Sequence, residues 1–238
     1  MADFKLKKGF DISVAGKADL NLVDLAEPKK VALQPIEFRG IRAKLEVEVG
    51  DVVKKGSPLF HSKDNPDIKF VSPISGKVIE INRGERRALL EIVVENDNRN
   101  ETETFAKIEE KDVASAKKED IIKIMVDNGL WPMMRQRPFS KVANPSDEPR
   151  DIFIAGMDTA PLAADVNFIL HGLEKEFQHG IDLLARLTSG KVYLNTDGRA
   201  REDFFKSINN VEKNTFSGMH PAGNVGVRLD TQQISKTG

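Results

Sequence analysis

The sequence predicts an α+β chain in two parts: a region of short β-strands, then an α/β domain with a parallel sheet. Up to about residue 100, apolar and polar residues alternate in short runs that end at glycine or proline, a pattern typical of half-buried strands. Beyond about Asp112, apolar residues recur at helical spacing. In this region two short apolar runs, typical of buried strands, are separated by runs with the helical pattern. A strand, helices and another strand in that order favour a parallel sheet.

Composition narrows the class of protein. The chain has 238 residues, 39% of them hydrophobic and 31% charged, which allows one large or two small soluble domains. A net charge of −1 gives no sign of a nucleic-acid surface, so no nucleic-acid partner is expected. The absence of cysteine excludes disulfides, thiolate zinc sites, cysteine-ligated iron–sulfur clusters and a cysteine nucleophile. We expect no membrane span, because charged residues interrupt the longest apolar runs, and no signal peptide, because the N-terminus lacks an apolar core followed by a small-residue cleavage site.

The first domain is predicted over residues 1–110 as a β domain. One strand is expected at Leu45–Val49, with Leu45, Val47 and Val49 on one face, before a turn at Gly50-Asp51. Gly76 marks a further turn between short strands.

The second domain is predicted over residues 111–215 as α/β. A helix is expected around Ile121–Met125, ending at Asn128-Gly129. After Trp131-Pro132 several prolines predict irregular structure, and here Arg135 and Arg137 form a small basic cluster. We take these two arginines as a candidate contact for an anion or a partner, the alternative being a solvated loop.

The clearest α/β pattern begins at Ile152–Ala155, a short apolar run that predicts a buried strand. Asp158-Thr159 can cap a helix that would run to about Gly172, with Pro161 in its first turn. A second helix is expected from Leu173, then a strand at "KVYLN" and a short helix at "REDFFKSIN".

Gly156, Asp158 and Thr159 are the candidate cofactor-binding residues, because a helix start directly after a strand can hold an anion. Their segment, "AGMDTAP", matches neither the dinucleotide fingerprint nor a P-loop, so the motif itself does not indicate a flavin or a nucleotide. His171 and His179 lack a third ligand at metal spacing, and no metal site is expected. No nucleophile, base and orienting acid form a catalytic set, so no catalytic residue is assigned.

The spacing of "VGDVVKKGSPLF" followed by "SPISGKVIEI" resembles the barrel-sandwich hybrid fold of biotinyl and lipoyl carrier domains. Those carriers hold their modified lysine in a tight hairpin. Here the equivalent connection is His61–Phe70, where Lys63 and Lys69 stand in a longer loop that contains Asn65-Pro66. We therefore expect the scaffold without a covalently bound cofactor.

Taken together, the motifs resemble the A subunit of the Na⁺-translocating NADH:quinone reductase, the NqrA family. The resemblance runs in order over nearly the whole chain, through "LKKGFDISVAGK", "KKVAL", "VGDVVKKGSPLF", "FVSPISGKVIEINRGERRAL", "NGLWPMMRQRPFSKVANP", "FIAGMDTAPLAAD" and "FSGMHPAG". Two departures are Met219, where the family usually has proline, and length, because family members are about twice as long.

The resemblance implies a Rossmann-like second domain similar to the flavin-binding subunit of respiratory complex I. It implies a peripheral subunit on the cytoplasmic side of the inner membrane, in a complex that passes electrons from NADH to quinone and exports sodium. Its partners would be the other subunits, chiefly a membrane-embedded one. Quinone is the ligand that the family suggests, and NADH oxidation belongs to other subunits. An independent enzyme using a flavin or a lysine-linked cofactor is the alternative.

The end of the chain, residues 216–238, is predicted as a Gly-rich joint and a truncated, polar, helix-free tail, and the residues after Val227 look unlike the family. Phe216–Gly223 would be a hinge into a further domain and, without that domain, an easily cleaved segment.

Overall fold

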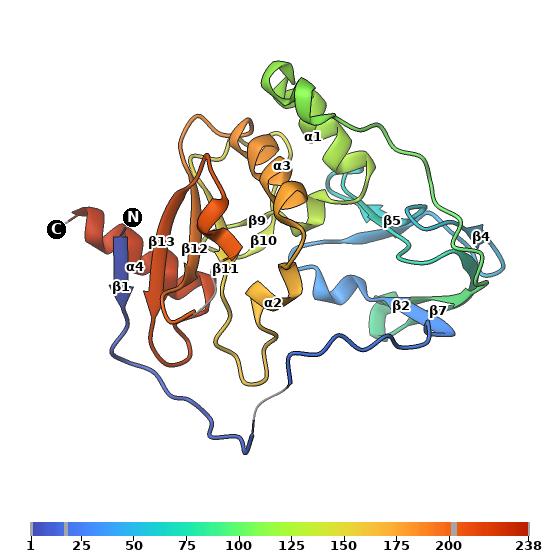
Figure 1. Ribbon diagram of the computed structural model, residues 1–238. Coiled ribbons are helices and arrows are strands. Elements are labelled where there is room, and N and C mark those ends of the chain that lie inside the picture. The colour runs from blue at the N-terminus through green and yellow to red at the C-terminus, as the bar shows by residue number, and fades with distance from the viewer. Residues whose placement is uncertain (1, 17–18, 201–203, 238) are drawn as a thin grey trace. The chain divides into compact units, whose positions relative to one another are not determined.

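The computed structural model describes residues 2–16, 19–200 and 204–237. It divides into two compact units, which Figure 1 shows in ribbon form. The barrel unit is Asp24–Asp147, and the α/β unit combines Met1–Val23 with Glu148–Gly238. This division differs from the boundaries expected at residues 110 and 215, and the packing described below gives the reason.

The barrel unit is built on two small antiparallel sheets, beside the two-stranded hairpin described below. One has the order β2 (Lys30–Leu33), β8 (Leu89–Asn96), β7 (Gly76–Arg83) and β4 (Val52–Val53); the other has the order β3 (Ala43–Leu45), β5 (Pro58–Ser62) and β6 (Lys69–Val71). Short 3₁₀ turns occur at Pro35–Glu37, Glu85–Arg87, Glu110–Ser115 and Trp131–Met133. The predicted β domain is confirmed, but the strand expected at Leu45–Val49 ends at Leu45, and Val49 is exposed at the turn.

Aromatic rings fill the core of the barrel unit. Phe60 and Phe70 are stacked with centroids 4.3 Å apart, and the ring of Phe38 meets Phe70 edge-on at 4.5 Å. Helix α1 (Lys118–Asp127) and the following segment pack on the same core through Val126, Trp131 and Val142. Trp131 is only 5% exposed, and its indole Nε1 donates to the carbonyl oxygen of Ala143 at 2.8 Å. The helix is confirmed, but it completes the barrel unit.

A hairpin of two very short strands follows Trp131. It pairs β9 (Arg135–Gln136) with β10 (Lys141–Val142) in antiparallel register. The chain expected to be irregular after Trp131-Pro132 therefore has one ordered turn, anchored in the core by Val142.

The α/β unit is built on a four-stranded sheet in the order β1 (Ala2–Lys5), β13 (Glu212–Ser217), β12 (Val192–Asp197) and β11 (Ile152–Gly156). All of its strand pairs are parallel, as predicted. Helix α3 (Glu174–Ala185) packs Ile181 against Leu194 of β12. Helix α4 (Val225–Thr237) reaches the next residue of that strand, because Gln232 Nε2 donates to Asn195 Oδ1 at 2.8 Å. Since side chains alternate along a strand, α3 and α4 cover opposite faces of the sheet.

Three local predictions were wrong. Asp158-Thr159 does not start a helix: α2 is Val166–Leu170, its N-cap is Asp165, and Leu162 at φ 61° lies in a turn that precludes a helix from Pro161. The "REDFFKSIN" helix is a 3₁₀ turn at Phe204–Ser207, and its first residues lie outside the described part of the chain. The tail expected to be helix-free contains α4, whose Arg228 and Leu229 are buried.

No helix among the described residues is long and apolar enough to cross a bilayer.

Candidate functional site

The loops at the carboxyl ends of the parallel strands form the candidate site of the α/β unit. Because all four strands run in one direction, the segments that follow Gly156, Asp197, Ser217 and Lys5 leave the sheet at the same edge. Ligands of doubly wound sheets bind outside this edge. The sequence motifs "LKKGFD", "AGMDTAP" and "FSGMHPAG" supply three of these four segments.

Thr159 lies at the centre of the contacts between these loops. Its Oγ1 accepts a hydrogen bond from the backbone N–H of Gly223 at 2.8 Å and lies 3.1 Å from Nδ1 of His220. The backbones come so close that a Cβ at Gly223 would lie 2.4 Å from the nitrogen of Thr159. Glycine is therefore required at position 223 by the approach of the loop after β11.

His220 connects these loops to the segment after β1. Its backbone N–H donates to Asp11 Oδ1 at 2.8 Å, and its carbonyl oxygen accepts from the backbone N–H of Phe10 at 2.8 Å. A Cβ at Gly9 would lie 2.5 Å from the same carbonyl oxygen. Three loops that are far apart in the sequence are thus joined at one edge of the sheet.

The other two predicted cofactor-binding residues, Gly156 and Asp158, make contacts that serve the local fold. Gly156 is buried at the end of β11, where a Cβ would lie 3.0 Å from the ring of Phe205. Asp158 is exposed, and its Oδ1 accepts from the backbone N–H of Ala160 at 2.8 Å, which closes a local turn. Of the three, Thr159 alone takes part in the contacts that join the loops.

An ion pair stands at the same edge, after β12. Arg199 donates from Nε to Asp197 Oδ1 and from Nη2 to Asp197 Oδ2, each at 3.0 Å. These hydrogen bonds to Asp197 raise the pKa of Arg199, and the charge of Asp11 adds to the effect. The guanidinium therefore has an internal carboxylate partner in a two-bond geometry.

Acidic side chains occupy the helix starts in this unit. Asp165 Oδ1 accepts from the backbone N–H groups of Asn167 and Phe168, at 2.9 and 3.3 Å, at the start of α2. Helix α3 carries Glu174 and Glu176 in its first turn. Asp165 satisfies free amides of α2, and the two glutamates interact favourably with the dipole of α3, so an incoming phosphate would meet negative charge at both helix starts.

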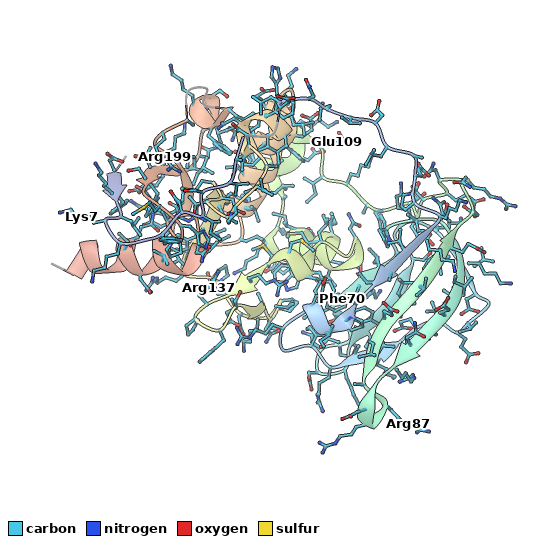
Figure 2. All side chains as sticks on the ribbon, turned by 90° about the horizontal axis from the view of Figure 1, so that it is seen from below. Lys7, Phe70, Arg87, Glu109, Arg137 and Arg199 are labelled. Carbon is cyan, nitrogen blue, oxygen red and sulfur yellow. The ribbon has the colours of Figure 1, made fainter. Side chains whose placement is uncertain are left out.

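Arg135 and Arg137 belong to the barrel unit, in the β9–β10 hairpin, and Figure 2 labels Arg137. Both side chains are exposed, and Arg135 Nη1 donates to the carbonyl oxygen of Ser140 at 3.5 Å. Large apolar side chains occur in the same short segment: Met133 is 68% exposed and Phe139 is 70% exposed. We call Leu130, Met133, Arg135, Arg137 and Phe139 the hairpin surface.

Sequence reasoning missed the roles of Asp11 and His220. Both lie within quoted motif segments, which was the available signal, but 209 positions separate them along the chain. Their contact follows from the pairing of β1 with β13. The alternation of apolar and polar residues within one segment cannot predict which strands pair. In residues 2–16, 19–200 and 204–237, no three His, Cys, Asp or Glu side chains converge as a metal-binding group.

The fold and these sites define a chain of two types of domain, a barrel-sandwich hybrid and a parallel α/β domain. Comparison with known families matches both: residues 4–97 match the NqrA N-terminal barrel-sandwich hybrid domain, and residues 116–237 match the NqrA second alpha/beta domain. The chain belongs to the NqrA family.

Relatives in this family are named as the A subunit of the Na⁺-translocating NADH-quinone reductase. The chain is 41% identical over 224 residues to the protein of Vibrio alginolyticus and 42% identical over 224 residues to that of Vibrio atlanticus, covering 94% of this chain and 50% of each relative. It is 38% identical over 237 residues to the protein of Saccharophagus degradans, covering 98% of this chain and 52% of that relative. The chain spans about half the length of the curated relatives it matches.

Proposed function

We propose that this chain serves as a peripheral part of a membrane complex that passes electrons from NADH to a quinone and exports sodium ions. Membership of the NqrA family supports this proposal, since the relatives are named as one subunit of such a reductase. The chain would lie on the cytoplasmic side of the membrane, with the other reductase subunits, chiefly a membrane-embedded one, as its partners.

The chain itself would not oxidise NADH or hold a flavin. The observation that supports this part is the contact of Gly223 with Thr159: a backbone amide and a hydroxyl bond to each other at the carboxyl ends of the strands, the edge at which doubly wound sheets bind their ligands. The capping carboxylate of Asp165 and the glutamates at the start of α3 add charge that repels phosphate. The α/β unit would keep the fold of the flavin-binding subunit of complex I without its cofactor.

The hairpin surface would provide the quinone-side contact, with no covalently bound cofactor. A quinone needs apolar surface for its ring and tail and donors for its two carbonyl oxygens. Met133 and Phe139 offer the apolar surface, and the guanidinium groups of Arg135 and Arg137 offer the hydrogen-bond donors. The same mixture of exposed apolar side chains and arginine is typical of the centre of protein interfaces, so a membrane-embedded subunit can cover it.

The test assembles the reductase with substituted NqrA protein and measures two reactions. We expect Phe139→Asp to lower quinone reduction by at least ~10-fold, a loss of about 1.4 kcal/mol of interaction, while NADH oxidation by an artificial electron acceptor stays unchanged. Val52→Asp is the matched control, because Val52 is also an exposed apolar residue of the barrel unit, on β4. Equal quinone reduction in both variants would refute a role for the hairpin surface, and a parallel loss of NADH oxidation would refute the division of labour.

A further inference from the structure

The segment that connects the two units carries an unusual amount of exposed apolar surface. We call residues 10–16 and 19–25 the connecting segment. Each of these residues is exposed, and the segment contains neither helix nor strand. Its large apolar side chains include Phe10 at 75%, Leu22 at 84% and Leu25 at 84% exposure, and the others are Ile12, Val14, Leu20 and Val23. Scattered apolar residues on a surface are ordinary, but a continuous series of this kind marks an interaction site.

Both ends of the connecting segment are fixed to folded parts of the chain. At the first end, Phe10 and Asp11 bond to the backbone of His220, each at 2.8 Å. Just beyond the other end, the carboxylate oxygens of Glu27 accept from the side-chain amides of Asn96 and Asn100, each at 3.2 Å. The segment is therefore bonded to folded chain at or near each of its ends, which favours a permanent interface over a free tail.

The pattern of the connecting segment favours a protein strand as the partner. Phe10, Ile12 and Val14 alternate with polar or small residues, and so do Leu20 and Leu22. This is the pattern of a half-buried strand, although the described residues give this segment no strand neighbour. Pairing with an exposed sheet edge supplies the missing backbone hydrogen bonds and buries alternate side chains.

A lipid surface fits the charges poorly. Asp11, Asp19 and Asp24 are interspersed with the apolar residues, whereas segments that bind anionic membranes carry lysine and arginine beside theirs. We therefore take a protein partner as the one that the observations favour.

We propose that the connecting segment is the docking strand for the second half of the NqrA protein, the part of the relatives that lies beyond the match with this chain. The relatives from Vibrio alginolyticus and Saccharophagus degradans are about twice as long as the matched region. In these relatives the further half lies in the same polypeptide and is therefore present at a fixed, high effective concentration, which suits a permanently displayed apolar segment. This inference is independent of the quinone-side proposal, because no residue of the hairpin surface takes part in it.

The test compares this chain with the same chain joined to the remaining half of the Vibrio alginolyticus relative. Hydrogen exchange is measured by mass spectrometry on peptides that cover residues 10–25. We expect exchange in the joined protein to be slower by at least ~10-fold, because pairing protects backbone amides. The double variant Leu20→Asp, Leu22→Asp should restore fast exchange in the joined protein. Leu162→Asp, at another exposed apolar residue of the α/β unit, should leave the protection in place.

Two results would overturn the proposal. Equal exchange of residues 10–25 in the short and joined proteins would show that the second half does not cover the segment. Protection that appears only when other reductase subunits are added would assign the segment to an intersubunit interface. Far-UV circular dichroism of the aspartate variant confirms that both units remain folded, so that fast exchange reports on docking.

Discussion

Replacing Gly223 by alanine tests whether the loop contacts at the strand ends hold the α/β unit together. The new methyl group would lie 2.4 Å from the backbone nitrogen of Thr159, 2.8 Å from its Oγ1 and 2.9 Å from the carbonyl carbon of Asp158. Two of these three atoms belong to the backbone, so a change of rotamer cannot relieve the clash, and the two loops must separate.

The loss of folding stability in Gly223→Ala has two contributions. Forcing extra atoms into a packed site costs about 1–3 kcal/mol. Separation of the loops also lengthens the hydrogen bond from the N–H of Gly223 to Thr159 Oγ1, worth about 0.5–1.5 kcal/mol. We therefore expect the free energy of unfolding to fall by about 2–4 kcal/mol. At ~1–3 kcal/mol per molar urea, this lowers the urea midpoint of the α/β unit by about 1 M or more.

The assay is urea unfolding of the whole chain followed by far-UV circular dichroism. Fluorescence of Trp131, the single tryptophan, reports on the barrel unit in parallel. Gly180→Ala is the matched control: it is the same substitution in the same unit, inside α3, and its Cβ meets no atom within 4 Å. It should stabilise by about 0.5–1 kcal/mol through helix propensity. If Gly223→Ala unfolds at the urea concentration of the unmodified protein, the loops are not in the contact described here.

Three further predictions concern other parts of the chain. Gly76→Ala should unfold the barrel unit, because its Cβ would lie 1.8 Å from the carbonyl oxygen of Glu95. Gly50→Ala should destabilise the same unit by only about 1 kcal/mol, because Gly50 has a φ of 107° but open space around it. Thermal melts of the two variants measure the difference. Asp165→Ala should destabilise the α/β unit by about 1 kcal/mol in urea, since it removes the cap of α2. Hydrogen bonds from the backbone of Arg99 and from Ser75 lower the pKa of Asp97 in the folded protein. The contribution of Asp97 to folding stability is therefore present above its unfolded pKa and is lost as pH falls through its folded pKa. Asp97→Asn should make the stability of the protein depend less on pH in this acidic range, as measured by unfolding at a series of pH values.

The elements set by local pattern could be predicted from the sequence. Alternation and turn residues predicted the β domain, and the order of strand, helices and strand predicted a parallel sheet, which β11, β12 and β13 form. Gly50 also has the positive φ expected of a turn glycine. These predictions succeed because each depends on neighbours a few residues apart.

The elements set by distant contacts could not be predicted in this way. β1 is the edge strand of the α/β sheet although it begins the chain, and its partner β13 lies more than 200 positions away. Trp131 and α1 looked like the start of the α/β domain, yet their apolar side chains pack on the barrel core. The tail looked polar, but Arg228 and Gln232 are buried against the sheet with bonds to Asn195, a role that hydropathy alone conceals.

The candidate site shows the same limit in its glycines. A glycine in a loop at the end of a parallel strand allows the backbone to approach either a bound phosphate or another loop, and a motif cannot distinguish the two. In this chain the distances around the two glycines show which neighbour the backbone approaches. Gly9 faces the carbonyl oxygen of His220, and Gly223 faces the nitrogen of Thr159. Both contacts join one segment of the chain to another, so these motif glycines should behave as packing positions. Their substitution should disturb folding of the α/β unit in the absence of any ligand, which a site built only for a cofactor would not do.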